Sequence, residues 1–122
     1  MISQVEFSVG RQVVGGFPVV SVRGEIDVYS APALKDAVTD VLSPDHSAVI
    51  VDLTDVGFLD STGLGALVAA RTSATDSDMR LLIVSDRDRI LKLFRITGLD
   101  GVFEIFPTVD QAVEALGAPT DA

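Results

Sequence analysis

The chain has 122 residues, of which 48% are hydrophobic and 22% charged, a length and balance typical of one globular domain with its own core. Eighteen acidic residues against nine basic ones leave a net charge of -9, so the field around the molecule repels nucleic acid and anionic lipid surfaces. The sequence has no cysteine, no signal-peptide pattern and no apolar run long enough to span a bilayer, which excludes disulfides and thiol catalysis and leads us to expect a cytoplasmic protein.

The N-terminal segment has the pattern of a β-hairpin. Residues 5–9 alternate between apolar and polar types, Gly15-Gly16 is a turn signal, and residues 17–22 resume the extended pattern. Pro18 cannot donate to a strand ladder, so we expect it at the start of its strand or on a sheet edge.

A helix, a buried strand and a second helix are expected in the middle of the chain. Ser30 as a cap, followed by Pro32, predicts a helix start, and apolar residues recur at helical spacing up to Ser43-Pro44. Residues 48–53 form a short β-branched run, typical of a strand buried on both faces, at the centre of the sheet. The next six residues are interpreted as an unusually apolar connector, and the second helix is expected to begin around Ser61.

The C-terminal part continues this alternation. The expected elements are a buried strand over residues 80–84, a helix over 86–97 closed by Gly98, a short strand over 102–106, and a final helix capped by Pro107-Thr108. Strands alternating with helices after a hairpin predict an α/β fold with one mixed sheet, parallel in its later part and covered by about four helices. We expect a single domain over residues 1–122, frayed only at 117–122.

Two polar clusters are the candidates for function, because open α/β sheets bind ligands beyond the carboxyl ends of their strands. They are Gly24-Glu25-Ile26-Asp27-Val28-Tyr29-Ser30 and Asp60-Ser61-Thr62-Gly63-Leu64-Gly65. In the second cluster, Asp60 or Ser61 is expected to cap the helix, with Gly63 relieving crowding. A hydroxyl at a helix N-terminus is also well placed to carry a phosphate, so capping and phosphorylation of Ser61 are compatible.

The first cluster has a structural interpretation as well. Asp27 is a residue type that caps turns, and Tyr29 can pack half-buried with its hydroxyl in water.

Enzyme interpretations lack the residues that they need. A serine nucleophile requires a base, but the single histidine, His46, lies in a polar loop and is interpreted as an exposed loop residue. The Asp-Ser-Thr-Gly string at Asp60 is present in one copy within an α/β pattern, which does not fit an aspartic protease. Gly63-Leu64-Gly65 lacks the spacing of a dinucleotide fingerprint.

A receiver domain phosphorylated on Asp52 with bound Mg²⁺ is a second candidate, because Asp52 is expected to end the central strand. Such a site also needs an acidic pair after the first strand and a lysine after the last one, where this chain has Glu6 and Phe106-Pro107-Thr108. The alternative for Asp52 is a strand-end carboxylate that binds neighbouring backbone N–H groups, which we prefer.

The two clusters, in this order and within this strand-helix pattern, resemble the bacterial anti-sigma-factor antagonists of the STAS-domain family. The first cluster, extended to Ala31-Pro32, is similar to the family's early motif, and Asp52-Leu53 together with Phe58-Leu59-Asp60-Ser61-Thr62-Gly63-Leu64-Gly65 is similar to its phosphorylation loop. The resemblance runs from about Val5 to Leu116 and implies a free-standing antagonist.

The resemblance implies a partner switch and no enzymatic activity or cofactor of its own. The unmodified antagonist binds an anti-sigma factor that is also a serine kinase, and this frees the sigma factor. The kinase, with its own ATP and Mg²⁺, phosphorylates Ser61, with Thr62 as the weaker alternative, and a metal-dependent serine phosphatase resets the switch.

The resemblance also implies which residues meet the partner. Asp27 and Asp60 contact the kinase or shape the loop, and Gly63, Leu64 and Gly65 form part of the docking surface. Because some members of the family are not phosphorylated, a non-phosphorylated STAS module within a larger signalling assembly stays open as an alternative.

Overall fold

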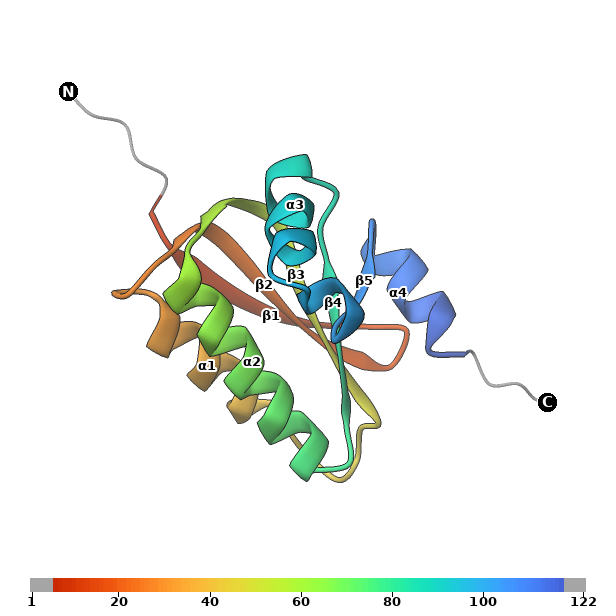
Figure 1. The fold of residues 1–122 in the computed structure, drawn as a ribbon. Helices are drawn as coiled ribbons and strands as arrows, with labels where there is room; N and C mark the ends of the chain where they lie inside the picture. The colour runs from red at the N-terminus through yellow and green to blue at the C-terminus, as the bar shows by residue number, and fades with distance from the viewer. Residues whose placement is uncertain (1–5, 118–122) are drawn as a thin grey trace.

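The computed structural model describes residues 6–117, which form one β-sheet and four α-helices (Figure 1). In chain order the elements are β1 (Ser8–Val14), β2 (Phe17–Ile26), α1 (Ala31–Asp40), β3 (Ala48–Leu59), α2 (Ser61–Asp76), β4 (Arg80–Val84), α3 (Asp88–Ile96), the 3₁₀ turn η1 (Leu99–Gly101), β5 (Glu104–Phe106) and α4 (Val109–Ala115). Of the tail expected to fray, residues 118–122 lie outside the described residues.

The five strands lie in the order β1-β2-β3-β4-β5. β1 and β2 form an antiparallel hairpin, and every other neighbouring pair is parallel, which confirms the predicted mixed sheet. The turn residues Gly15 and Gly16 have φ angles of 60° and 89°, the left-handed backbone that two-residue hairpin turns require. Pro18 is the second residue of β2, at the start of its strand as expected.

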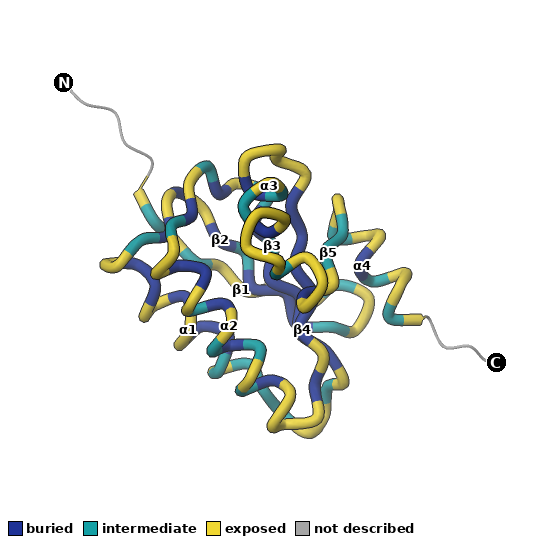
Figure 2. The backbone as a smooth tube through the Cα atoms, in the orientation of Figure 1, coloured by how far each residue is buried: buried dark blue, intermediate teal, exposed yellow. Residues whose placement is uncertain are grey.

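The two faces of the sheet are covered unequally. Apolar side chains of α1, α2 and α3 join one core cluster with Val20, Val51 and Ile83 of the sheet, whereas α4 packs on the opposite face against a smaller cluster that includes Ile50 and Leu82. The buried backbone runs through the central strands between these layers (Figure 2). Each crossover from β2 to β5 moves in the same direction across the sheet, so right-handed connections place the first three helices on one side.

The prediction of a connector between the central strand and α2 is wrong, because β3 continues through this segment to Leu59. The β3 residue that pairs with β2 shifts from Asp52 to Asp55, and further along from Val56 to Phe58. At each shift β3 has one more residue than the facing stretch of β2. These bulges make every third residue of this segment point inward, namely Leu53, Val56 and Leu59. An extended segment with two bulges therefore lacks the period of two that identifies strands.

Several element ends also differ from expectation. Of the expected first strand, residue 5 lies outside the described residues, and β1 begins only at Ser8. Phe7 packs against the core instead of pairing. α1 ends at Asp40, before Ser43, because the N–H of Val41 turns to the carbonyl of Val38 and closes the helix. α3 and β5 each start two residues later than predicted.

Candidate functional site

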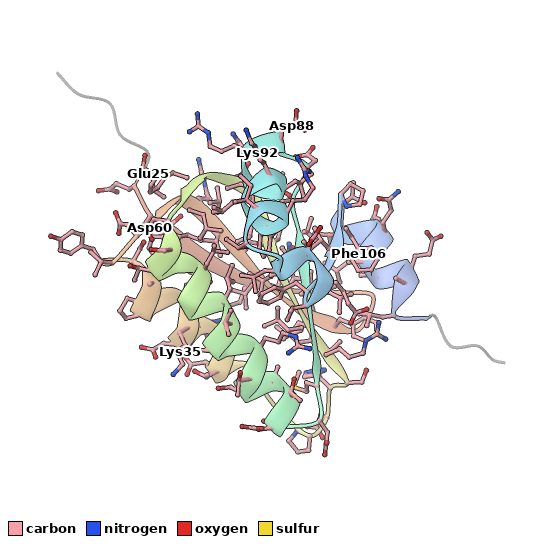
Figure 3. All side chains as sticks on the ribbon, viewed as in Figure 1. Glu25, Lys35, Asp60, Asp88, Lys92 and Phe106 are labelled. Carbon is pink, nitrogen blue, oxygen red and sulfur yellow. The ribbon has the colours of Figure 1, made fainter. Side chains whose placement is uncertain are left out.

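The two polar clusters meet at one edge of the sheet. β2 and β3 are parallel, and Ile26 at the end of β2 pairs with Leu59 at the end of β3. The N–H of Asp60 donates to the carbonyl of Ile26 over 3.2 Å, which ties the start of α2 to the end of β2. In Figure 3, Glu25 and Asp60 lie close to this end of the molecule, beside the first turn of α2. The predicted site residues therefore form one continuous region.

The start of α2 is capped by Asp60, the first of the two predicted candidates. Its Oδ1 accepts the N–H of Gly63 over 2.9 Å, and its carbonyl accepts the N–H of Leu64. Ser61 is the first helical residue, and both Ser61 and Thr62 are exposed. With capping supplied by Asp60, the Ser61 hydroxyl lies at the positive end of a sixteen-residue helix.

The other three residues of the predicted docking surface differ in exposure. Leu64 is only 5% exposed and belongs to the core, and Gly63 is buried. A Cβ on Gly63 would collide with the side chain of Leu59 and lie 3.0 Å from the carbonyl oxygen of Ile26. Gly65 is exposed. Gly63 thus allows close approach of this chain's own β2, and in this structure it and Leu64 support the exposed residues from beneath.

The loop from β2 to α1 is held by the side chains of Asp27 and Ser30. Asp27 Oδ1 accepts the N–H groups of Tyr29 and Ser30, at 2.9 and 3.2 Å, which is the turn-capping role predicted for Asp27. The Ser30 hydroxyl donates to the carbonyl of Glu25 and accepts the N–H of Asp27, both at 2.9 Å. Ser30 occupies the N-cap position of α1 as expected, but its hydroxyl bonds the preceding loop instead of the helix.

Tyr29 is 89% exposed, so the half-buried packing predicted for it is wrong. Asp27 fixes the backbone on one side of Tyr29 and α1 begins on the other, which leaves the ring pointing away from the core.

An open groove of about 300 Å³ lies beside this loop, and sequence reasoning missed it. Its lining includes three carboxylates, Glu6, Glu25 and Asp27, together with Tyr29. Glu6 precedes β1 and Glu25 is the last residue but one of β2, and only the antiparallel hairpin brings them together. The sequence contains no local signal for this pairing.

Asp52 lies within β3 and does not end it, contrary to expectation. Its Oδ1 accepts the N–H of Thr54 over 3.0 Å and is also bonded by the Thr54 hydroxyl. This is the local backbone bonding that we preferred over a receiver site.

His46 lies in the loop before β3 and is half-buried, whereas we expected it to be exposed. Its N–H donates to the carbonyl of Ser43. The twelve residues of β3 separate it from Ser61, a distance of about 40 Å along an extended strand. His46 therefore cannot act as a base for the Ser61 hydroxyl.

Residues 6–117 contain neither a metal-binding cluster nor a membrane-spanning helix. Among these residues no group of three or more histidine, aspartate or glutamate side chains is arranged to hold a metal ion. None of the helices described is both long enough and apolar enough to cross a membrane.

The comparisons with known proteins agree on one family. The family model of the STAS domain matches residues 9–112. The chain is 40% identical over 86 residues to an anti-sigma-B factor antagonist of Listeria monocytogenes, which covers 70% of this chain and 75% of the relative. It is 37% identical to an anti-sigma-B factor antagonist of Staphylococcus aureus, over 70% of this chain and 80% of that protein.

A solved structure supports the same assignment. The crystal structure of an anti-sigma factor antagonist from Mycobacterium paratuberculosis has a TM-score of 0.81 and 34% identity to this chain, and the match covers 90% of this chain and 93% of that one. The sheet order, the helix arrangement and the capped start of α2 thus occur in a sequence that matches the family over most of its length. The chain belongs to the STAS domain family.

Proposed function

We propose that this protein is an anti-sigma-factor antagonist that binds an anti-sigma factor and so releases a sigma factor for transcription. The names of the relatives from Listeria and Staphylococcus support this role, as does the match to the Mycobacterium structure. The protein acts by binding, in the cytoplasm, and needs neither a cofactor of its own nor contact with DNA. The acidic composition favours a protein partner over nucleic acid.

The proposed switch is phosphorylation of Ser61 by serine-kinase activity of the anti-sigma factor, with ATP and Mg²⁺ held by that kinase. The observation that carries it is the exposed Ser61 hydroxyl at the first position of α2, where Asp60 already caps the helix. Phosphorylation adds a charge of about -1.5 to -2 next to Asp60. The nucleotide phosphates in the kinase site repel that charge, so the modified antagonist dissociates until a serine phosphatase restores it.

The surface proposed to meet the anti-sigma factor combines both clusters. Asp60, Ser61, Thr62 and Gly65 supply its helix side, and Asp27 shapes its loop side. Gly63 and Leu64 act from below, by keeping the helix start against β2.

The experiment is mass spectrometry of the intact protein and its peptides after incubation with ATP, Mg²⁺ and each candidate anti-sigma kinase of the same genome. Ser61→Ala is the test variant, and Thr62→Ala is the matched control on the adjacent exposed hydroxyl. One phosphoryl group mapped to Ser61, absent in Ser61→Ala and present in Thr62→Ala, is the expected result.

Other outcomes identify the alternatives. If Ser61→Ala is still phosphorylated and Thr62→Ala is not, the phosphate acceptor is Thr62. An acid-labile phosphate on Asp52 supports the receiver interpretation. If the anti-sigma factor binds but no phosphate is added, the antagonist function stands and the phosphorylation switch is overturned. If the protein neither binds an anti-sigma factor nor is phosphorylated, but assembles into multimers, the scaffold module is supported.

A further inference from the structure

The loop between β2 and α1 presents two apolar side chains to solvent. Tyr29 is 89% exposed, the largest value among the large hydrophobic residues described, and the adjacent Val28 is 57% exposed. A tyrosine gains much of its interaction energy by burying its ring, and tyrosine is one of the residue types that concentrate binding energy at the centre of protein interfaces.

What distinguishes Tyr29 from an incidental surface residue is the rigidity of its backbone. Asp27 Oδ1 accepts the N–H of Tyr29 itself, and the carbonyl of Asp27 accepts the N–H of Ala31 over 2.8 Å. Ser30, only 7% exposed, closes the loop onto the carbonyl of Glu25. A ring held on such a loop loses little conformational entropy when a partner covers it.

The charges around Tyr29 define the chemistry of the surface that would cover it. The lining of the groove at its base includes Glu6, Glu25 and Asp27, and Asp60 caps α2, whose start is bonded to the end of β2 just before this loop. Complementarity between interfaces places opposite charges against one another. A partner that fits this site therefore has an apolar pocket for the ring and basic side chains on the rim facing the groove.

We propose that Tyr29 is the anchor by which this protein docks onto the anti-sigma factor, with its ring in an apolar pocket of the partner and the Glu6, Glu25 and Asp27 carboxylates facing a basic rim. This inference rests on the proposed function. It assigns docking to the β2–α1 loop and leaves the Ser61 hydroxyl free to meet the nucleotide phosphates.

The chain offers a matched control for this proposal. Val13 is 66% exposed and lies opposite Pro18 at the start of β2, whereas Tyr29 follows the end of that strand. The ten residues of β2 correspond to about 33 Å. Val13→Ala thus removes exposed apolar surface at the other end of the sheet.

The test is the dissociation constant of the unmodified protein with the anti-sigma factor that binds the wild type, measured by titration calorimetry. Tyr29→Ala is expected to weaken binding by about tenfold or more. Tyr29→Phe, which keeps the ring, and Val13→Ala are each expected to stay within about twofold of the wild type. Thermal melting of Tyr29→Ala should match the wild type, since the ring is exposed.

Each result separates the proposal from the function on which it rests. Equal binding by Tyr29→Ala and the wild type overturns the anchor while the antagonist function stands. Equal weakening by Val13→Ala and Tyr29→Ala also overturns it, because the effect is then not local to the loop. If none of the anti-sigma factors of the genome binds the wild type, the proposed function fails and the anchor fails with it.

Discussion

Ser61 is exposed and carries its hydroxyl at the start of a helix that another residue caps. Because Asp60 supplies the capping bond, Ser61→Ala should leave stability within about 0.5 kcal/mol of the wild type. We expect Ser61→Ala to bind the anti-sigma factor persistently in the presence of ATP. Ser61→Asp should bind about tenfold more weakly, because it imports the repelling charge.

Calorimetry with and without ATP, accompanied by melting curves, checks this prediction. A folded Ser61→Ala variant that fails to bind would show that the hydroxyl itself is required for docking, and the permissive role assigned to it would be wrong.

Asp27 acts through the loop that it shapes. Its Oδ1 accepts two backbone N–H groups, and an asparagine oxygen can accept the same two bonds. Asp27→Ala is therefore expected to weaken binding by about tenfold through loss of the fixed loop. Asp27→Asn should recover most of that loss while removing one charge from the groove.

Dissociation constants for both variants, with hydrogen exchange at the Tyr29 and Ser30 amides, distinguish shape from charge. Faster exchange should occur in Asp27→Ala only. If Asp27→Asn binds as poorly as Asp27→Ala while its amides stay protected, the carboxylate charge is what the partner recognises.

At the scale of single elements, α2 contains two glycines in opposite environments. Alanine replaces glycine inside a helix with a usual gain of about 0.5–1 kcal/mol. Gly65 is exposed, and a Cβ there would meet open space among the described residues, so Gly65→Ala should gain that amount. A Cβ on Gly63 would press on Leu59 and Ile26, so Gly63→Ala should instead lose about 1–3 kcal/mol.

Urea unfolding of the two variants gives the comparison directly. Opposite signs are expected for the change in the free energy of unfolding. A gain in stability for Gly63→Ala would mean that β2 and α2 separate easily, and the close contact between the two clusters would then not be a rigid feature of the site.

At the scale of the whole molecule, charge is distributed unevenly. Residues 87–95 contain four of the nine basic residues, Arg87, Arg89, Lys92 and Arg95, and one acid, Asp88. This segment therefore carries +3 and the remainder of the chain -12, which together give the net charge of -9. This positive charge lies on α3 and on Arg87 at its N-cap, and Figure 3 shows Lys92 and Asp88 of α3 apart from Lys35 of α1.

This polarity predicts that association with a partner that has a basic rim is electrostatically steered. The association rate constant should fall about tenfold between 0.05 and 0.5 M NaCl, while the dissociation rate changes little. Stopped-flow measurements on Glu25→Gln, in the groove, and Lys92→Gln, on α3, localise the effect. Only Glu25→Gln should slow association at low salt. An association rate independent of salt would contradict a basic docking rim.

Much of this protein is determined by local sequence. The β-branched run of the central strand, the apolar residues 81–84 of β4 and the Asp-Ser-Thr-Gly start of α2 each encode a backbone preference within a few residues, and the structure confirms all three. The polar clusters after β2 and β3 were identifiable because parallel strands bring their carboxyl ends to one edge.

Contacts between distant residues decided the rest. Two bulges against β2 extended β3 through a segment without strand period, and the hairpin placed Glu6 beside Glu25. Whether Leu64 and Tyr29 faced the core or the solvent depended on packing of α2 against the sheet and on the Asp27 turn. Backbone preference is set by neighbours in the chain, whereas strand register and side-chain exposure are set by which surfaces the folded chain brings together.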